Sequence, residues 1–467
     1  MNKLLKQDLD NRTALLHAAT AHATEYLANI EEHFVAPTVP NRPMKKLPDE
    51  GIGAEKTLAM FEKEYTPYIQ ATTGPRFLGY VIGGNTPAAL MGDWLTSAYD
   101  QNAFGIPGTI DRVIEDEAIR FLCDMLSLPE SFGGLFCSGA TMANYTALAI
   151  AREWALAKQG KAADDGIYGF EPPVFVTGTG HASIYKALSM LGIGRSNMVQ
   201  LPLLPGREAV DPAAVEAYLK SNPDKHVVVI ANAGTVNSGD IDDIPFLAAL
   251  KDKYDFYLHI EGAIGTIAAV SPKYAPYFAG MEKADTVTID AHKWLNTPYD
   301  GAAVLVNGKE NHQYQFNVFA QLNHAEGAYS ETTAFTNLGP EGSRRMRALP
   351  AWFSLMAYGK QGYIDITEQN CALAKQIEGI INSSPYLRVV HDVRLNIASF
   401  TLNRKMVTMK DVNLFATLVK ETGVTFLNTA TVLGVPVIRV CVSNYQTTEQ
   451  DIRIAGEAIL KVAEQFA

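Results

Sequence analysis

Between residues 134 and 308, short apolar runs rich in β-branched and aromatic residues alternate with stretches of helical periodicity. The runs are GLFCSG (134–139), VFVTG (174–178), HVVVIANAG (226–234), FYLHIEG (256–262), TVTIDAHK (286–293) and AAVLVNG (302–308). Helical stretches between them include 141–157, 182–191 and 215–221. Apolar strands separated by helices are typical of a mostly parallel sheet with helices on both faces. In such sheets ligands bind at the carboxyl ends of the strands, so we expect chemistry from the residues that follow each run.

The flanking regions have different patterns. Apolar residues in 4–34 recur at helical spacing, and three prolines in VAPTVPNRP (35–43) end the predicted helix. Such a helix has no core of its own, so we expect it to pack on another part of the chain or on a partner subunit. From about residue 346 onward, a long helical stretch precedes two apolar runs and two further helices, which predicts a small α+β domain. The runs are IASFTL (397–402) and VPVIRVCV (435–442), and the helices lie near 410–421 and at 448–466.

These patterns divide the chain into three predicted parts. They are an N-terminal helical segment at 1–90, a large α/β domain at 91–345 and a small C-terminal α+β domain at 346–467. The large domain contains all six apolar runs of the central region, so we expect it to carry the ligand site.

Composition excludes several classes of protein. Apolar residues make up 47% of the chain and charged residues 19%, which argues against a disordered, coiled-coil or collagen-like protein. The net charge is −11 and no basic run occurs, so we expect no nucleic-acid partner. No stretch approaches the ~20 apolar residues of a membrane span, and the N-terminus lacks the apolar core of a signal peptide. The four cysteines are far apart and form no CxxC, so we expect a cytoplasmic protein without a disulfide framework or a metal site.

Four of the runs are followed by groups that can carry chemistry. Lys293 follows TVTID, Glu261 follows FYLHI, His181 opens the helix after VFVTG, and Ser138–Thr141 leads from GLFC into a helix. Each group has an ordinary structural explanation when it is taken alone: a lysine that reaches the surface, a salt-bridged carboxylate, a helix-start histidine and a turn. Together they meet the requirements of pyridoxal phosphate (PLP). A lysine forms the Schiff base, a helix N-terminus binds the phosphate, a carboxylate keeps the pyridine nitrogen protonated, and an imidazole stacks on the ring.

The sequence around these groups resembles the PLP-dependent amino-acid decarboxylases of fold type I, which include aromatic-amino-acid, glutamate and histidine decarboxylases. DAHKWLNTPYDGAAVLV (290–306) resembles their lysine segment and LFCSGATMANYTAL (135–148) their phosphate segment. TGHASIYKA (179–187) resembles the stacking-histidine segment and YLHIEGAIG (257–265) the carboxylate segment. The resemblance runs over roughly residues 50–460. It implies a mostly parallel seven-stranded sheet with flanking helices. It also implies a homodimer with shared active sites, in which the N-terminal helix wraps across the partner and the 324–342 loop reaches the other subunit's site.

The resemblance also implies a role for each residue. Lys293 would bind the cofactor covalently, His292 would reach the phosphate, and His181 would stack on the ring. The remaining cofactor-binding residues would be Ala140, Thr141 and Asn144 at the phosphate, Thr235 and Ala263 at the ring, and Glu261 at the pyridine nitrogen. Glu261 is a departure, because the family has aspartate here, and the extra methylene adds roughly 1.5 Å. Either the backbone retracts or the ring shifts to accommodate it.

The implied reaction converts an L-amino acid into its amine and CO₂ through an external aldimine. A tyrosine on a mobile loop after the lysine commonly protonates Cα in this family, and the equivalent stretch here is 324–342. Its one tyrosine, Tyr329, is the predicted catalytic proton donor, although it does not align cleanly with the family position, to which Phe335 or Thr336 lies nearer. Without Tyr329 in this role, the product would shift toward decarboxylation with deamination.

Substrate choice is expected to depend partly on a segment at the end of the predicted N-terminal part, whose residues favour an apolar or aromatic substrate unless they are core residues. They are Phe77, Tyr80, Val81, Ile82 and Asn85. Arg344, Arg345 and Arg347 either bind a carboxylate or, as we expect, form ion pairs beneath the loop. Two alternatives stay open at this point: a transaminase or aldolase on the same fold, which the His-Lys-Trp segment disfavours, and a PLP-binding protein with weak catalysis.

Overall fold

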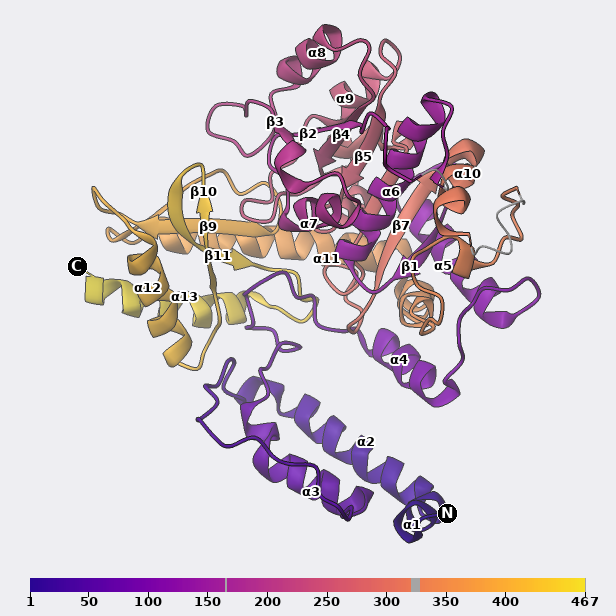
Figure 1. The fold of residues 1–467 in the computed structure, drawn as a ribbon. Coiled ribbons are helices and arrows are strands. Elements are labelled where there is room, and N and C mark those ends of the chain that lie inside the picture. The colour runs from indigo at the N-terminus through magenta and orange to yellow at the C-terminus, as the bar shows by residue number, and fades with distance from the viewer. Residues whose placement is uncertain (164–165, 321–327, 467) are drawn as a thin grey trace.

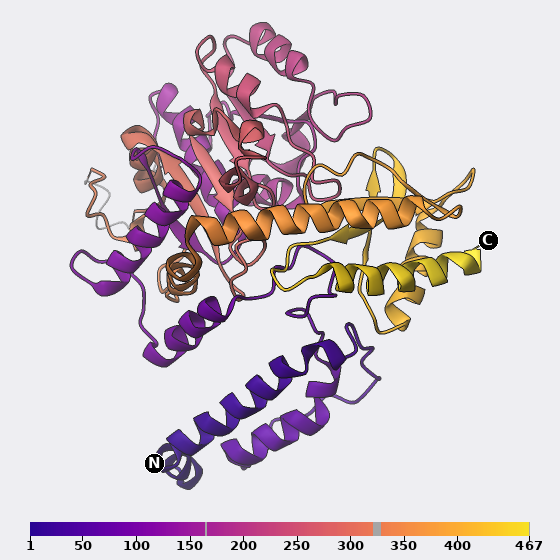
Figure 2. The same ribbon diagram turned by 180° about the vertical axis from the view of Figure 1, so that it is seen from behind.

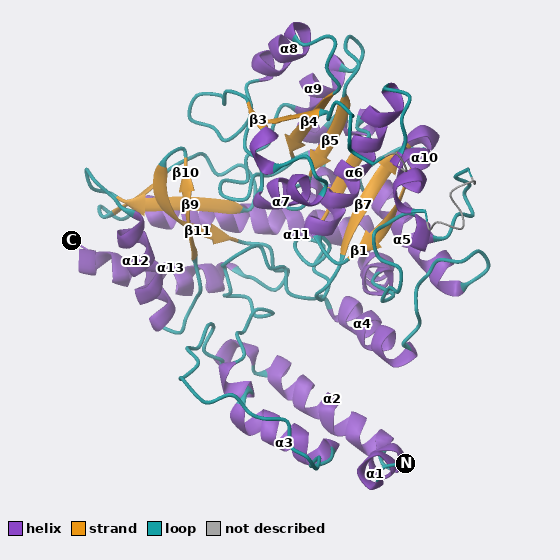
Figure 3. Ribbon diagram, viewed as in Figure 1, coloured by secondary structure: helices purple, strands orange, loops and turns teal. Residues whose placement is uncertain are grey.

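The computed structural model describes residues 1–163, 166–320 and 328–466. A large α/β part lies beside a smaller α+β part, and a helical hairpin at the N-terminus projects away from both (Figure 1, Figure 2). The strands lie in the two larger parts (Figure 3).

Over the described residues, seven strands form the large sheet in the order β1-β7-β6-β5-β4-β2-β3. Their bounds are β1 (Phe132–Cys137), β2 (Val174–Thr177), β3 (Val199–Gln200), β4 (Val227–Asn232), β5 (Tyr257–Glu261), β6 (Thr286–Ile289) and β7 (Ala302–Asn307). β7 is antiparallel to β1 and β6, and the other neighbours are parallel. Every residue of β4, β5 and β6 is buried, as expected for strands covered on both faces. The predicted fold class, a mostly parallel seven-stranded sheet, is confirmed.

Helices cover both faces of this sheet. One face packs on α6 (Ala140–Lys158), α7 (Ala182–Met190) and α10 (Gly308–Phe319). The other packs on α5 (Ile110–Met125), α8 (Pro212–Ser221), α9 (Ile244–Leu250) and the first half of α11 (Ala348–Asn382). In β4, Val227 and Val229 belong to the second core, whereas Val228 and Ile230 belong to the first, because successive strand residues point to opposite faces.

The small part is built on an antiparallel sheet in the order β10-β11-β9-β8. Its elements are β8 (Leu387–Val389), β9 (Ile397–Leu402), α12 (Met409–Glu421), β10 (Asn428–Val432), β11 (Val435–Cys441) and α13 (Glu449–Ala463). The second half of α11 packs in the same core as β9 and β11, so one long helix joins the two parts (Figure 2). Near the middle of α11, Gly359 has a φ of +57°, which interrupts the helical geometry there. The predicted α+β organisation of this region agrees with these elements, and β8 and β10 are additional strands.

The N-terminal prediction of one helix over 4–34 is wrong. The segment forms α1 (Lys3–Asp10) and α2 (Arg12–Ala28), with Asn11 between them outside helical geometry. Asparagine has a low helix propensity, because its side chain competes for backbone hydrogen bonds. α3 (Ala54–Glu64) lies alongside α2, and His22 of α2 pairs with Glu62 of α3 at 3.2 Å. In the described chain none of these three helices has a buried side chain.

The remaining helices are short or connect the parts. α4 (Pro87–Tyr99) packs on α11. Short 3₁₀ helices lie at Ile30–Glu32, Thr66–Tyr68, Arg195–Asn197, Thr266–Val270, Ala275–Phe278, Met281–Lys283, Phe335–Asn337 and Glu464–Phe466. Among the helices that the structure describes, none is both long enough and apolar enough to cross a bilayer.

Candidate active site

Lys293 lies in the turn that follows β6, where it contacts a buried aspartate. Lys293 Nζ is 3.1 Å from Asp290 Oδ2, and His292 Nε2 is 3.2 Å from Asp290 Oδ1. Burial alone raises the pKa of Asp290, but the charges and hydrogen bonds of Lys293 and His292 outweigh it and hold that pKa below its usual value. Asp290 therefore holds the lysine and the histidine together. Sequence reasoning missed it, although an acid at the end of a buried strand was a usable signal.

The turn between β1 and α6 forms a cradle beside His292. A Cβ added to Gly139, the residue before α6, would lie 3.5 Å from His292 Cε1. Ala140 is buried and Thr141 is exposed; the amides of Met142 and Ala143 donate to the Gly139 carbonyl oxygen, whereas those of Ala140 and Thr141 precede the first intrahelical bond. Free amides, the positive end of a helix dipole and an adjacent imidazole suit the phosphate of PLP, so these residues fit the predicted role.

His181 caps the N-terminus of α7 and faces the same site. Its Nδ1 accepts a hydrogen bond from the Ser183 N–H at 3.3 Å and lies 2.7 Å from Ser183 Oγ. Burial lowers the pKa of His181, Lys293 lowers it further, and Glu261 opposes the shift. His181 therefore lies close enough to Glu261 and Lys293 for their charges to affect it, and a single site for the three residues stays a prediction.

Glu261 is the last residue of β5 and is 4% exposed. Its backbone is in register with Asn232 of β4 and Thr288 of β6. Over the described part of the chain, its carboxylate makes no hydrogen bond or ion pair with another residue. A buried carboxylate without a partner is costly, so this side chain is available for a ligand such as the protonated pyridine nitrogen.

The two residues predicted at the cofactor ring are both buried near β4 and β5. Thr235 is 3% exposed, and its hydroxyl donates to Glu208 Oε2 at 2.9 Å. Since this hydroxyl already donates to Glu208, Thr235 can contact the cofactor ring only through its other atoms. Ala263 is 4% exposed and follows β5 by two residues.

Asn144 has partners other than the predicted phosphate. It is completely buried in α6, and its carboxamide bonds Ser183, Thr288 and His259. Both Nδ2 and Oδ1 of Asn144 are therefore hydrogen-bonded to other side chains of the protein. In place of the predicted phosphate contact we propose the positioning role argued below.

The predicted substrate segment runs against the backbone of Lys293. A Cβ on Gly83 would lie 1.8 Å from the Lys293 carbonyl oxygen, so only glycine allows this approach. Within the segment, Phe77 is buried and stacks on Phe426 with centroids 5.0 Å apart, and Val81 packs in a core cluster. Phe77 and Val81 are therefore core residues, which was the alternative to a role in substrate binding.

Three residues of the same segment remain accessible. Tyr80 is 52% exposed, and Ile82 and Asn85 are partly exposed. They are therefore the residues of this segment that a substrate can contact.

The three arginines of the 343–347 segment form ion pairs, as expected. Arg344 pairs with Glu115 at 2.7 Å, and both side chains are 1% exposed. Arg345 pairs with Asp93 at 2.8 Å, and Arg347 pairs with Asp300 at 2.9 Å and with Glu341 at 3.1 Å. These pairs agree with the expectation that the three arginines form structural ion pairs and do not bind a substrate carboxylate.

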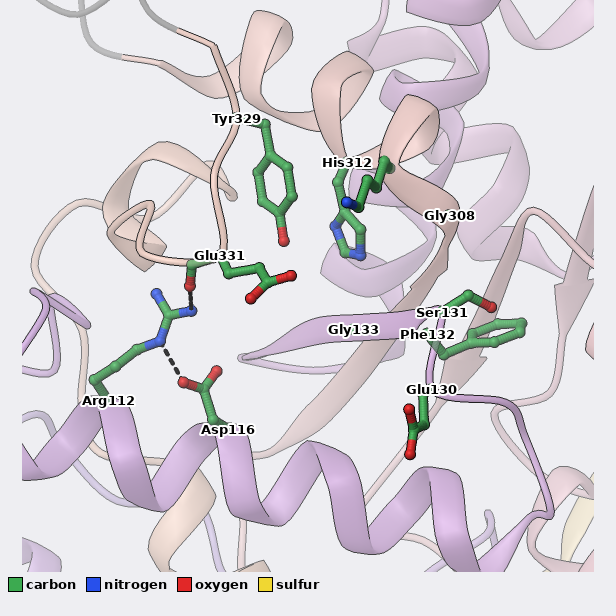
Figure 4. A pocket seen from close by; sticks show the side chains of 11 residues that line it. Arg112, Asp116, Glu130, Ser131, Phe132, Gly133, Gly308, His312, Tyr329 and Glu331 are labelled. Atoms are coloured by element: carbon green, nitrogen blue, oxygen red, sulfur yellow. Dashed lines mark hydrogen bonds and ion pairs between the residues drawn. The ribbon is translucent and has the colours of Figure 1, made fainter.

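Tyr329 lies away from Lys293 of its own chain. It stacks on His312 with ring centroids 4.8 Å apart, and its N–H donates to Gln313 at 2.8 Å. Both rings line a cavity of about 490 Å³ at the amino end of β1, whereas the phosphate cradle follows the carboxyl end of that strand (Figure 4). Residues 324–327 of the predicted loop lie outside the described residues. Phe335 is buried beneath Arg112, whose guanidinium carbon is 4.4 Å from the ring centroid.

Two further residues near the site were missed by sequence reasoning. Arg439 of β11 is 7% exposed, and among the described residues it has no acidic partner; its Nε has no hydrogen bond. Burial lowers the pKa of Arg439, and its two Nη atoms donate to the carbonyl oxygens of Val236 and Tyr80 and to Asn237 Oδ1. Tyr299 stacks on His292 with centroids 4.0 Å apart, and burial together with the charge of Asp290 raises the pKa of Tyr299 to about 12. A charged residue inside the apolar run VPVIRVCV was the available signal for Arg439.

Comparison with known families identifies the class of enzyme. The pyridoxal-dependent decarboxylase conserved domain matches residues 41–403. The chain belongs to this family. It is a PLP-dependent carboxy-lyase that decarboxylates an amino acid, so the predicted family, cofactor and reaction class are confirmed. Among the described residues, no group of three His, Cys, Asp or Glu side chains is arranged to hold a metal ion.

Relatives and solved structures agree with this assignment. The aromatic-L-amino-acid decarboxylase of Bacillus atrophaeus is 29% identical over 439 residues, covering 91% of this chain and 89% of the relative. The 4-hydroxyphenylacetaldehyde synthase of Rhodiola rosea is 24% identical, covering 81% and 79%. The structure of Oryza sativa TDC with PLP and tryptamine has a TM-score of 0.87 at 22% identity, covering 98% of both chains, which shows a shared fold.

Proposed function

We propose that this decarboxylase acts on an L-amino acid with an apolar or aromatic side chain and releases the amine and CO₂. The observation that carries the proposal is the convergence of Lys293, His181 and Glu261 at the carboxyl ends of neighbouring strands, next to the accessible residues Tyr80 and Ile82. Tyrosine and isoleucine offer an apolar contact surface rather than a charge for the substrate side chain. Relatives named for tryptophan, tyrosine and aromatic amino acids support this substrate class.

Each of the predicted site residues would have a separate role in binding PLP. Lys293 would hold PLP, while Ala140, Thr141 and His292 bind its phosphate. Ala263 and Thr235 would pack near the ring, and His181 would cover one ring face. When bound, PLP withdraws electrons from the bond that breaks at Cα of the substrate. The protein decides which bond breaks by turning the substrate so that the bond to the carboxylate stands perpendicular to the ring.

Replacing Glu261 by glutamine tests the proposed ion pair with the pyridine nitrogen. We expect turnover to fall on the order of 10²-fold, since removing one partner of a buried charge pair typically costs about 2–5 kcal/mol. Glu261→Asp, which keeps the charge, should retain more activity than Glu261→Gln. Both variants are compared by steady-state kinetics and by titration of the apoenzyme with PLP. Unchanged turnover and PLP affinity in Glu261→Gln would contradict this role.

A panel of L-amino acids tests the proposed function. CO₂, amine, aldehyde and keto acid are each quantified, and we expect CO₂ and amine in equal amounts from aromatic or aliphatic substrates. Keto acid without CO₂ would indicate transamination, and turnover of acidic substrates alone would overturn the proposed substrate class. PLP binding without turnover of any amino acid would support the weakly catalytic alternative.

Decarboxylation with deamination is a second candidate, favoured by the positions of Tyr329 and Phe335. Tyr329 lies at the opposite end of β1 from the phosphate cradle, and the buried Phe335 has no hydroxyl with which to protonate Cα. Relatives named as aldehyde synthases are similar to this chain. This reaction would consume O₂ and water and release aldehyde, ammonia and H₂O₂ together with CO₂, so the product panel distinguishes it.

We propose further that two copies form a homodimer with shared sites. Exposed apolar side chains support this: Leu5, Leu9 and Leu16 on the N-terminal hairpin, and Met91, Ile110, Val113 and Met356 on α4, α5 and α11. An apolar patch of this kind marks an interaction surface. The α1–α3 hairpin, which has little contact with its own chain, would extend over the partner subunit.

The dimer makes a direct prediction. We expect the double substitution Ile110→Asp and Val113→Asp to convert a dimer into monomers in analytical ultracentrifugation, because it buries two charges in the interface. Activity should fall at least tenfold if sites are shared. Met406→Asp, at a residue that is 81% exposed on the small part, is the matched control. A wild-type monomer, or an unchanged double variant, would contradict the proposal.

A cytoplasmic location is also proposed. Its support is that all four cysteines are buried free thiols.

A further inference from the structure

A buried chain of polar side chains connects the large sheet to His181. It runs from Thr286 of β6 through His259 of β5, Asn144 of α6 and Ser183 of α7 to His181. Consecutive polar atoms are separated by 3.0 Å (Thr286 Oγ1 to His259 Nδ1), 3.1 Å (His259 Nε2 to Asn144 Oδ1), 2.9 Å (Asn144 Nδ2 to Ser183 Oγ) and 2.7 Å (Ser183 Oγ to His181 Nδ1). The four members before His181 are at most 4% exposed, so water does not compete for these bonds.

The chemistry of each group fixes the direction of the last two hydrogen bonds. Asn144 Nδ2 can only donate, so Ser183 Oγ accepts that bond. The hydroxyl proton of Ser183 is then directed at His181 Nδ1, which also accepts the Ser183 N–H. With Nδ1 as an acceptor, a neutral His181 carries its proton on Nε2.

The hydrogen bonds on the other side of Asn144 are compatible with the same orientation of its amide. Its Oδ1 accepts from Thr288 Oγ1 at 2.8 Å and from His259 Nε2, which therefore carries a proton. Burial lowers the pKa of His259 to about 3, so this ring is neutral, and its Nδ1 accepts the hydroxyl of Thr286. Rotating the amide by 180° would require the proton of His259 to move from Nε2 to Nδ1 and the Ser183 hydroxyl to turn away from His181.

Burial, more than the surrounding charges, favours the neutral form of His181. Glu261 and Asp290 favour its protonated form, whereas Lys293 and Arg439 oppose it. Burial is the largest effect and lowers the pKa of His181, so the neutral ring is the form present near neutral pH.

We propose that Asn144 and His259 are positioning residues, which act through Ser183 to hold His181 in the tautomer protonated on Nε2. His181 then presents an N–H donor, and not a proton acceptor, to the cofactor and the substrate. This role rests on the proposed place of His181 beside the cofactor. It also accounts for the burial of Asn144, which a phosphate ligand does not require.

Asn144→Asp is the most direct test, because it preserves shape but replaces the amide donor with an acceptor. The Ser183 hydroxyl would turn to the new carboxylate, and His181 would take a proton on Nδ1 instead. We expect kcat to fall on the order of 10²-fold, the lower end for loss of a correctly protonated catalytic group. The acid limb of the kcat/KM profile should move to higher pH, because a nearby anion raises the pKa of a histidine. PLP affinity, measured by titrating the apoenzyme, should change less than about threefold.

A pair of variants at His259 separates positioning from mere packing. Glutamine places an N–H donor close to the position of Nε2, whereas leucine fills the space without one. We expect His259→Gln to keep kcat within about threefold of wild type and His259→Leu to lose on the order of tenfold. Thr146→Val is the control on α6, because among the described residues its buried hydroxyl bonds only the Met142 carbonyl of its own helix. It should leave kcat, the pH profile and PLP affinity unchanged.

Three results would overturn the proposal. A lower PLP affinity of Asn144→Asp, with normal kcat at saturating PLP, would make Asn144 a phosphate ligand. Equal losses in His259→Gln and His259→Leu would make His259 a packing residue. Wild-type kcat and pH profiles in both Asn144→Asp and His259→Leu would show that the chain does not position His181. If Asn144→Asp fails to fold, the comparison of His259→Gln with His259→Leu still tests the positioning role.

Discussion

Lys293→Ala should reduce kcat/KM by on the order of 10⁴-fold or more, the scale seen when a covalent catalytic group is removed. No other described amine lies in the same position: Lys293 is held 3.1 Å from Asp290, beside His292 and the turn that precedes α6. The variant would lose both the covalent attachment of PLP and the amine that returns after each turnover.

Borohydride reduction of the holoenzyme, followed by digestion and mass spectrometry, measures the attachment directly. The reduced adduct should appear on the peptide that contains Lys293 in the wild type and disappear in Lys293→Ala. Lys253→Ala is the control, since that side chain is 63% exposed. Recovery of the adduct on another peptide, or its absence from wild-type protein, would refute the proposed role of Lys293.

Glu115→Ala should destabilise the fold by about 3–5 kcal/mol, the typical cost of leaving one partner of a buried ion pair unpaired. Arg344 is 1% exposed and also donates to the carbonyl oxygens of Ala103 and Phe136. Glu115 additionally accepts the Phe136 N–H at 2.7 Å. The pair therefore fixes the end of β1 that leads into the phosphate cradle, and we expect PLP affinity to fall together with stability.

Urea unfolding of apoenzymes at one protein concentration gives this difference in the free energy of unfolding. The matched control is Asp93→Asn, which breaks the Arg345 pair, in which the arginine is 33% exposed. We expect that loss to stay within about 1 kcal/mol, because water solvates the remaining charge. A similar small loss in Glu115→Ala would show that the buried pair does not stabilise the fold.

Local patterns in the sequence predicted most of the large sheet. Five of the six apolar runs of the central region contain a whole strand and the run at 134–139 overlaps β1, because apolar β-rich segments between helices have few other ways to bury both faces. The seventh strand, Val199–Gln200, was implied only by family resemblance, since two residues carry no periodic signal. The break at Asn11 was missed because the helical spacing of apolar residues continues across it, although the backbone of Asn11 is not helical.

The sequence alone predicted that Lys293, His181, Glu261 and the turn before α6 lie at one edge of the sheet, because the carboxyl ends of parallel strands meet there. Only the tertiary structure revealed the partners of these groups: Asp290 against the lysine, Arg439 from the small part, and Asn144 bonded to His259 across 115 residues of sequence. It likewise separated Tyr329 from Lys293 of the same chain. Periodicity reports which face of an element is buried, but the partner of a buried polar group depends on which distant elements pack against it.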